Sequence, residues 1–169
     1  MKDILDIIID VTMWTILWVI ALYAVLCATA YTVSADEVLT LDERVVALTI
    51  LGESRGEGKM GMYAIAALIQ ERAKQRKLTP AQVCKQHKQF SVWNDKKERD
   101  LWHLWKSTSA PYARQLARYV CKGYGFANVT GRADHYYSKK IRSKPPYWAK
   151  GRKASATIGN HVFYRLAKN

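Results

Sequence analysis

The sequence is short of cysteine and has no metal-binding pattern. Its 169 residues include three cysteines and four histidines, with no Cys-x-x-Cys pair and no His-rich spacing. Structural zinc sites need about four closely spaced cysteine or histidine ligands, so the sequence argues against such a site. We expect neither a metal nor a cofactor.

Acidic residues are also scarce. The chain has 27 Lys and Arg against 14 Asp and Glu, a net charge of +13. Such a field favours an anionic polymer or surface as the partner, which includes nucleic acid, anionic lipid and bacterial wall polymer. The basic, aromatic stretch 139–153 keeps a nucleic-acid binder as an alternative. No helix-turn-helix, RNP or zinc-finger spacing occurs, so we expect no nucleic acid and treat the chain as a monomer.

Charge is absent altogether from residues 11–33, a run of 23. As a helix this run is long enough to cross the roughly 30 Å hydrocarbon core of a bilayer. We predict one N-terminal transmembrane helix, with residues 1–35 as a signal-anchor and residues 36–169 as one folded domain. A signal peptide cleaved at the Val33–Ala35 sequence and a buried core helix are the alternatives.

The three cysteines divide into one and two. Cys27 lies in the uncharged run, which leaves Cys84 and Cys121 as a candidate disulfide if the domain is exported. In a reducing compartment they would be two buried thiols. A cysteine nucleophile is a further alternative, but neither residue opens a recognisable nucleophile motif. The histidines available to such a nucleophile are His87, His135 and His161.

Two capping boxes and the hydrophobic spacing predict a mainly helical domain. Thr40 with Glu43, and Thr79 with Gln82, can each satisfy exposed N–H groups at a helix start. Helices are expected over 40–53, 60–77, 98–106 and 109–122, with a short one from Thr79. The segments "DHYYS" and "HVFYR" predict strands, and "IGNH" at 158–161 predicts a two-residue hairpin turn. The fold class is therefore α+β, mainly α, with a small antiparallel hairpin near the C-terminus.

Glu53 is the strongest candidate for chemistry. It follows an apolar run at the end of a helix, where desolvation and the helix dipole both favour the protonated carboxyl. A protonated carboxyl near neutral pH is what a glycosidase needs as its general acid. Glu57, four residues later in a glycine-rich turn, is a candidate second carboxylate. The alternative for each is a structural ion pair with a neighbour such as Lys59.

Aromatic side chains alternate with polar ones in the second half of the chain. Aromatic rings flanked by hydrogen-bonding groups suit a sugar, which has apolar ring faces and hydroxyl edges, although the same residues also suit an ordinary core. The candidate substrate-binding residues are Glu57, Gln89, Phe90, Ser91, Trp93, His135, Tyr136, Tyr137, Trp148 and His161.

Three blocks of this sequence resemble the cell wall hydrolase family typified by the spore cortex-lytic enzyme. "LGESRGEGKMGMYAIAALIQERA" is similar to the family's Gly-Glu-Ala-Arg-Gly-Glu turn and following helix, with Ser54 for alanine and Glu71-Arg72 at the helix end. "VCKQHKQFSVW" resembles its Val-Cys and Gln-Phe-Ser segment. "ADHYYSKKIRSKPPYWAKG" and "IGNHVFYR" resemble its closing region, where Asp134 replaces a small polar residue.

The resemblance, over about Val45 to Arg165, implies a lysozyme-like fold that degrades peptidoglycan. It implies cleavage between N-acetylmuramic acid and N-acetylglucosamine by a lytic transglycosylase or muramidase, with Glu53 as the catalytic acid and glycan strands as the partner. A wall-cutting domain would lie outside a single-pass inner membrane anchor, as in phage lysis proteins. A non-catalytic, membrane-anchored wall-binding module is the alternative.

Overall fold

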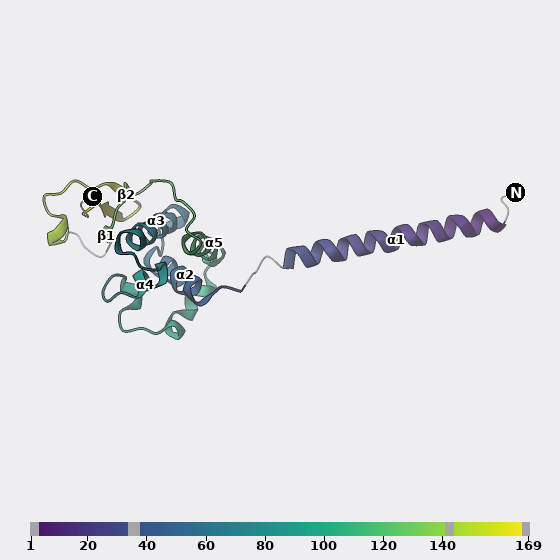
Figure 1. Ribbon diagram of the computed structural model, residues 1–169, viewed down its shortest axis with the longest axis horizontal. Helices are drawn as coiled ribbons and strands as arrows, with labels where there is room; N and C mark the ends of the chain where they lie inside the picture. The colour runs from purple at the N-terminus through teal and green to yellow at the C-terminus, as the bar shows by residue number, and fades with distance from the viewer. Residues whose placement is uncertain (1–3, 34–37, 141–143, 167–169) are drawn as a thin grey trace. The chain divides into compact units, whose positions relative to one another are not determined.

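The computed structural model describes residues 4–33, 38–140 and 144–166, and in the first helix it describes the side chains of residues 12–26 (Figure 1). The chain divides into two compact units, Met1–Val38 and Leu39–Asn169. Cys27 and the candidate cleavage sequence Val33–Ala35 lie outside the residues whose side chains are described.

The first unit contains helix α1, Ile4–Val33. Within the part of the chain that the structure describes, no helix is both long and apolar enough to cross a lipid bilayer. This finding corrects the prediction of a transmembrane helix at 11–33 and of a single-pass inner-membrane location. The expected association with a membrane is not shown.

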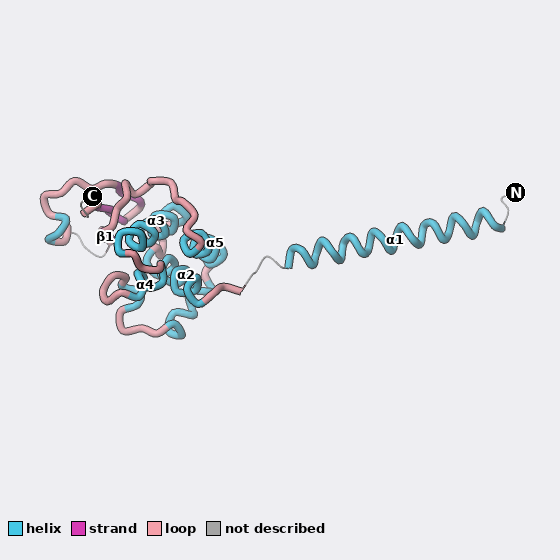
Figure 2. Tube along the Cα trace, in the orientation of Figure 1, coloured by secondary structure: helices cyan, strands magenta, loops and turns pink. Residues whose placement is uncertain are grey.

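The second unit is mainly helical, as the sequence predicts (Figure 2). Both predicted capping boxes form, at Thr40 with Glu43 and at Thr79 with Gln82. The elements are α2 (Leu41–Glu53), α3 (Gly58–Arg76), α4 (Pro80–Lys85) and α5 (Ala110–Cys121), with 3₁₀ segments η1 (Ser91–Trp93), η2 (Glu98–Lys106) and η3 (Tyr147–Ala149). The helix expected over 98–106 is present and is a 3₁₀ helix.

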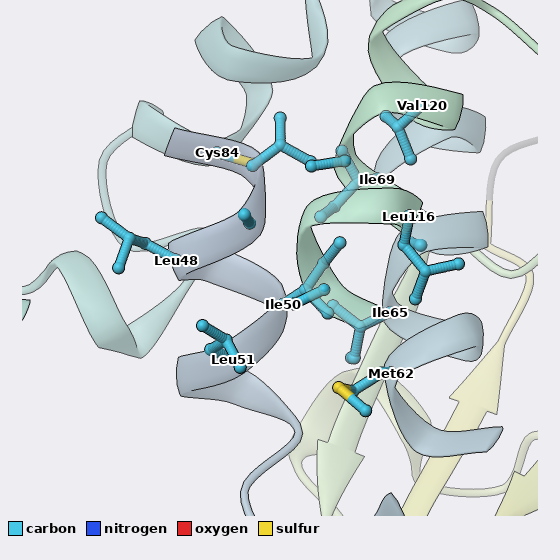
Figure 3. Close-up of a cluster of buried hydrophobic side chains, with 14 of the residues drawn as sticks. Leu48, Ile50, Leu51, Met62, Ile65, Ile69, Cys84, Leu116 and Val120 are labelled. Carbon is cyan, nitrogen blue, oxygen red and sulfur yellow. The ribbon is translucent and has the colours of Figure 1, made fainter. Parts of the chain in front are cut away.

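Helix α2 is the central element of this unit. It contacts α3, α4, α5 and both η1 and η2, and its residues from Val46 to Gly52 are all buried. Figure 3 shows Ile50 of α2 among the side chains of α3 and α5, including Ile65 and Leu116. Because neighbouring elements enclose this helix, their packing restricts where the backbone of its last residue, Glu53, can lie.

The sheet has three antiparallel strands, with β3 (His161–Tyr164) between β1 (His135–Ser138) and β2 (Ala156–Ile158). The predicted hairpin turn is present, since β2 and β3 are joined through Gly159, whose φ of +57° favours glycine. Tyr136 pairs with Phe163 in the register of β1 and β3, so both lie on one face with His161.

The two cysteines of this unit are separate. Cys84 is buried, Cys121 is half-buried, and both are free thiols in the structure, so the predicted disulfide is not formed there. Burial raises the pKa of each thiol to about 12. Neither is therefore suited to the alternative role of a thiolate nucleophile at neutral pH.

Candidate active site

A cleft of about 630 Å³ opens beside the end of α2. Its walls come from the turn after α2, the segment before η1, strand β1 and the residues around η3. The lining residues are Gly52, Glu53, Arg55, Glu57, Arg72, Lys88, Gln89, Ser91, His135, Tyr136, Tyr137, Ser138, Lys140, Pro146, Tyr147, Trp148 and His161.

Both carboxyl oxygens of Glu53 accept hydrogen bonds. Oε1 accepts from the backbone N–H of Val92 at 2.7 Å and from the Ser91 hydroxyl at 3.0 Å. Oε2 accepts from the Tyr136 hydroxyl at 2.7 Å. The sequence predicts apolar surroundings for this half-buried carboxyl, whereas the structure surrounds it with donors from two distant segments. These donors fix its orientation at the floor of the cleft.

The close approach of η1 to α2 depends on Gly52. A Cβ added at Gly52 would overlap the side chain of Val92, lying 2.7 Å from its Cβ and closer still to Cγ2. The same approach places the Trp93 Nε1–H 2.8 Å from the hydroxyl of Thr49, one turn earlier in α2. The absence of a side chain at Gly52 therefore lets the Val92 N–H reach Glu53.

Tyr136 and His161 form the wall of the cleft next to Glu53. Their rings pack edge to face with centroids 5.2 Å apart, and Tyr136 also stacks on Phe163. Burial raises the pKa of Tyr136 well above its ordinary value, and Glu53 acts in the same direction, so the phenol stays protonated as a donor. Burial lowers the pKa of His161 despite Glu57 and Glu53, so its imidazole is neutral near pH 7.

Glu57 holds the turn of the β2–β3 hairpin. Its side chain is 3% exposed, and it accepts from the backbone N–H and the side-chain amide of Asn160 at 2.8 and 2.9 Å. Lys140 Nζ lies 3.5 Å from Oε1. Burial alone would raise the pKa of Glu57, but the hydrogen bonds from Asn160 and the electrostatic effects of His161 and Lys140 outweigh it, and the net pKa is lowered.

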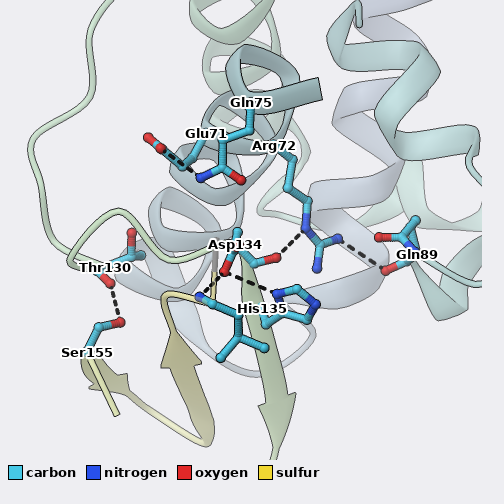
Figure 4. A network of polar contacts seen from close by, with 9 residues as sticks. Glu71, Arg72, Gln75, Gln89, Thr130, Asp134, His135 and Ser155 are labelled. Atoms are coloured by element: carbon cyan, nitrogen blue, oxygen red, sulfur yellow. Dashed lines mark hydrogen bonds and ion pairs between the residues drawn. The ribbon is translucent and has the colours of Figure 1, made fainter. Parts of the chain in front are cut away.

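Arg72 joins α3 to both sides of the cleft, as Figure 4 shows. It is 4% exposed, and its Nε donates to the carbonyl of Asp134 at 2.7 Å, while Nη1 donates to the carbonyl of Gln89 at 3.4 Å. Burial lowers the pKa of Arg72 to about 10, which still leaves it charged at neutral pH. Asp134 in turn accepts from the N–H of Leu166 and lies 3.1 Å from His135 Nδ1.

The described residues include no group of three or more His, Cys, Asp or Glu side chains placed to hold a metal ion. Glu57 instead pairs with Lys140, and Arg55 and Arg72 donate to backbone carbonyl groups. The chemistry available there is that of a hydrogen-bonded carboxyl.

Comparison with known proteins identifies the family of this chain. The cell wall hydrolase family matches over residues 56–164, which is more than half of the chain. The chain belongs to the cell wall hydrolase family. The crystal structure of the catalytic domain of the Bacillus cereus SleB protein is similar to it in fold, with 24% identity, a TM-score of 0.54, and coverage of 72% of this chain and 88% of that one. No curated protein sequence matches.

Membership of this family makes the chain a peptidoglycan-degrading enzyme. Most of the cleft lies within the matched residues, including Glu57, Arg72 and all three strands. Glu53 lies three residues before the match begins. Its place at the floor of the cleft therefore rests on the contacts described above.

The structure brings together nine of the candidate site residues and leaves two apart. Phe90 is 1% exposed and belongs to the hydrophobic core. The guanidinium carbon of Arg72 lies 5.0 Å from the centroid of the Phe90 ring. Trp93 donates a hydrogen bond to the hydroxyl of Thr49, and Lys85 Nζ lies 3.2 Å from the centroid of its ring. The nine that line the cleft are Glu53, Glu57, Gln89, Ser91, His135, Tyr136, Tyr137, Trp148 and His161.

Sequence reasoning missed the basic side chains of the cleft and the partner of Glu57. Arg55, Lys88 and Lys140 line the cleft, and Asn160 holds Glu57. Arg72 could have been identified from the sequence, because it follows the apolar residues of α3 at helical spacing. An arginine at such a buried position is almost always paired. The other residues depend on which segments meet in space.

Replacement of Glu57 by glutamine should destabilise the fold at neutral pH by about 1–2 kcal/mol, because it weakens hydrogen bonds to a buried charged group. Because the pKa of Glu57 is lowered in the folded protein, its ionised carboxylate stabilises the fold at pH values above 4.5, the ordinary pKa of glutamate. This stabilisation is lost as the pH falls through the pKa that Glu57 has in the folded protein. Urea unfolding of both proteins should therefore show a gap in the free energy of unfolding at pH 7, and this gap should narrow as the pH falls below 4.5. An equal gap at all pH values would contradict the charged, paired state of Glu57.

Proposed function

We propose that this chain acts as a monomer that cleaves the glycosidic bond between N-acetylmuramic acid and N-acetylglucosamine, with Glu53 as the general acid and base. The observation that carries this proposal is the Glu53 carboxyl, held through both oxygens at the floor of a cleft that is large enough for sugar rings. A general acid must be fixed within hydrogen-bonding reach of the leaving oxygen, and these contacts supply that constraint.

The two oxygens of Glu53 are suited to different roles. Oε1 faces the backbone N–H of Val92, a donor that cannot become an acceptor, so this oxygen remains unprotonated. Oε2 faces the hydroxyl of Tyr136, which can donate to a carboxylate and accept from a carboxylic acid by rotating its O–H bond. Oε2 is therefore the oxygen that carries the proton to the substrate.

We favour lytic transglycosylation over hydrolysis. The Oε2 proton moves to the glycosidic oxygen as the C1–O bond breaks, and the sugar's own 6-hydroxyl oxygen then forms a bond to C1. The proton released from that hydroxyl returns to Oε2, so no water is consumed and no second carboxylate is required. Glu57 supports this assignment, because Asn160 and Lys140 already occupy its carboxylate.

The cleft also offers groups for holding the sugars. Tyr147 is 90% exposed at its rim next to the half-buried Trp148, and an exposed ring of this kind suits stacking on a sugar face. His161 is 3% exposed, and among the described residues its buried Nδ1 has no hydrogen-bond partner. We assign substrate binding to these residues together with Gln89, Ser91, His135 and Tyr137.

Analysis of product ends tests the mechanism. Wild-type protein incubated with purified peptidoglycan should release fragments that end in 1,6-anhydro-N-acetylmuramic acid, which mass spectrometry separates from reducing ends because they lack one water. Reducing ends would overturn transglycosylation in favour of a muramidase. Binding to the wall without any shortening of strands would favour the non-catalytic module.

A further inference from the structure

A second cavity, of about 580 Å³, lies beside the turn that follows α2. Residues of this turn alternate between the two cavities, so that Glu53 and Glu57 line the cleft while Ser54 and Gly58 line the second cavity. The remaining lining residues come mainly from η2 and from the short segment between η2 and α5. The full lining is Leu51, Ser54, Arg55, Gly56, Gly58, Met62, His103, Leu104, Lys106, Ser107 and Ser109.

The ionisable side chains that line the second cavity are all basic. Its lining includes Arg55, His103 and Lys106, and no aspartate or glutamate. His103 and Lys106 are exposed, so their polar ends reach solvent. The serines beside them supply hydroxyl groups. Such a cavity is complementary to a small anionic group.

Two helix starts add to this complementarity. Gly58 is the first residue of α3, a helix of 19 residues, and Ser109 is the N-cap of α5, a helix of 12 residues. Neither start has a side-chain cap hydrogen bond. The dipoles of the two helices therefore favour negative charge near the cavity wall, in addition to the three basic side chains.

Arg55 connects this cavity to the cleft, because it lines both. Its Nε donates to the carbonyl of Gly52 at 3.1 Å, which holds the side chain next to the residue that precedes Glu53. A strand bound at Glu53 would therefore pass a basic group that faces the second cavity. Arg55 is therefore part of the wall of both cavities.

We propose that the second cavity is a subsite for a carboxylate of the peptide stem carried by the glycan strand. This proposal rests on the proposed function, because it takes the cleft as the place where the sugars bind. The sugars of a stem-bearing strand are neutral, because the lactyl carboxyl of N-acetylmuramic acid is amide-linked to the peptide, whereas that peptide ends in carboxylates. Removal of the stem by an amidase frees the lactyl carboxyl, which stays on the sugar in the cleft. A phosphate of a wall-linked polymer shares the same anionic chemistry, and the experiment separates the two sources.

The test compares full-length wild type with Lys106→Gln, Lys106→Arg and the control Lys122→Gln, which removes the same charge at an exposed lysine that lines neither cavity. Each protein is assayed on intact peptidoglycan, on strands whose stems have been removed by an amidase, and on wall stripped of phosphate polymer. The readout is the ratio of kcat/KM on intact material to kcat/KM on each stripped material.

Wild type should prefer stem-bearing strands, and Lys106→Gln should reduce that preference about two- to five-fold, the range for one partly exposed ion pair, through KM. Lys106→Arg and Lys122→Gln should keep the wild-type ratio. Equal ratios for wild type and Lys106→Gln overturn the subsite. A ratio that responds to removal of phosphate polymer but not of stems also overturns it. Failure of wild type to cut any strand would instead overturn the proposed function.

Discussion

Replacing Glu53 with glutamine should lower kcat for glycan-strand cleavage by about 10³-fold, within the ~10²–10⁴-fold range of general acid–base catalysis. Glutamine is nearly isosteric, and its carbonyl oxygen can still accept from the Val92 N–H and the Ser91 hydroxyl, while its NH₂ group can donate to the oxygen of Tyr136. The fold should therefore be retained while the transferable proton is lost. Release of soluble fragments from purified peptidoglycan measures the effect.

Glu71→Gln is the matched control for this substitution. Glu71 lies on α3, accepts a hydrogen bond from Gln75 at 3.0 Å and does not line the cleft. Its replacement should leave kcat within about two-fold of wild type, as expected for a surface change. If Glu53→Gln unfolds at the wild-type temperature and still clears peptidoglycan at the wild-type rate, Glu53 is not the acid.

Replacing Gly52 with alanine should affect both stability and activity. In a helix interior this change alone would stabilise by about 1 kcal/mol. Here the new methyl group would overlap Val92, and overpacking of this kind costs about 1–3 kcal/mol. Because Val92 also carries the N–H that holds Glu53, displacing it should lower kcat by up to about 10²-fold.

Thermal unfolding and cleavage rates check this prediction together. Gly125→Ala is the control, because a Cβ at Gly125 meets no atom within 4 Å and its φ is not positive. Its effect on stability should be within about 0.5 kcal/mol. A Gly52→Ala protein with raised stability and unchanged kcat would show that the contact between α2 and η1 does not position Glu53.

Local sequence patterns predicted the helices well where the signal lies within one turn. Thr40 and Thr79 begin their helices because the capping partner is three residues away, and the glycines after Glu53 end α2 where expected. The segment 98–106 was harder, because its apolar residues suit either an α-helix or a 3₁₀ helix. The membrane prediction rested on the uncharged run 11–33, and the described helix did not bear it out.

The candidate site shows the same division. Glu53 could be chosen from its own neighbourhood, since a carboxyl after an apolar run and before a glycine turn is unusual. Its actual partners are far along the chain, with Val92 39 residues away and Tyr136 83 residues away. Glu57 was predicted to face substrate or Lys59, yet its strongest contacts are with Asn160, 103 residues away.

By itself, the sequence determined the mainly helical class, the capped helix starts, the hairpin turn, and Glu53 as the residue of interest. Each of these depends on backbone geometry or side chains within a few residues. Only the tertiary structure decided that Glu53 lies among donors, that Phe90 belongs to the core, and that basic side chains line a second cavity. Those features depend on which distant segments pack together, and hydrophobic burial, which drives that packing, is non-directional and leaves no local signature of the partners.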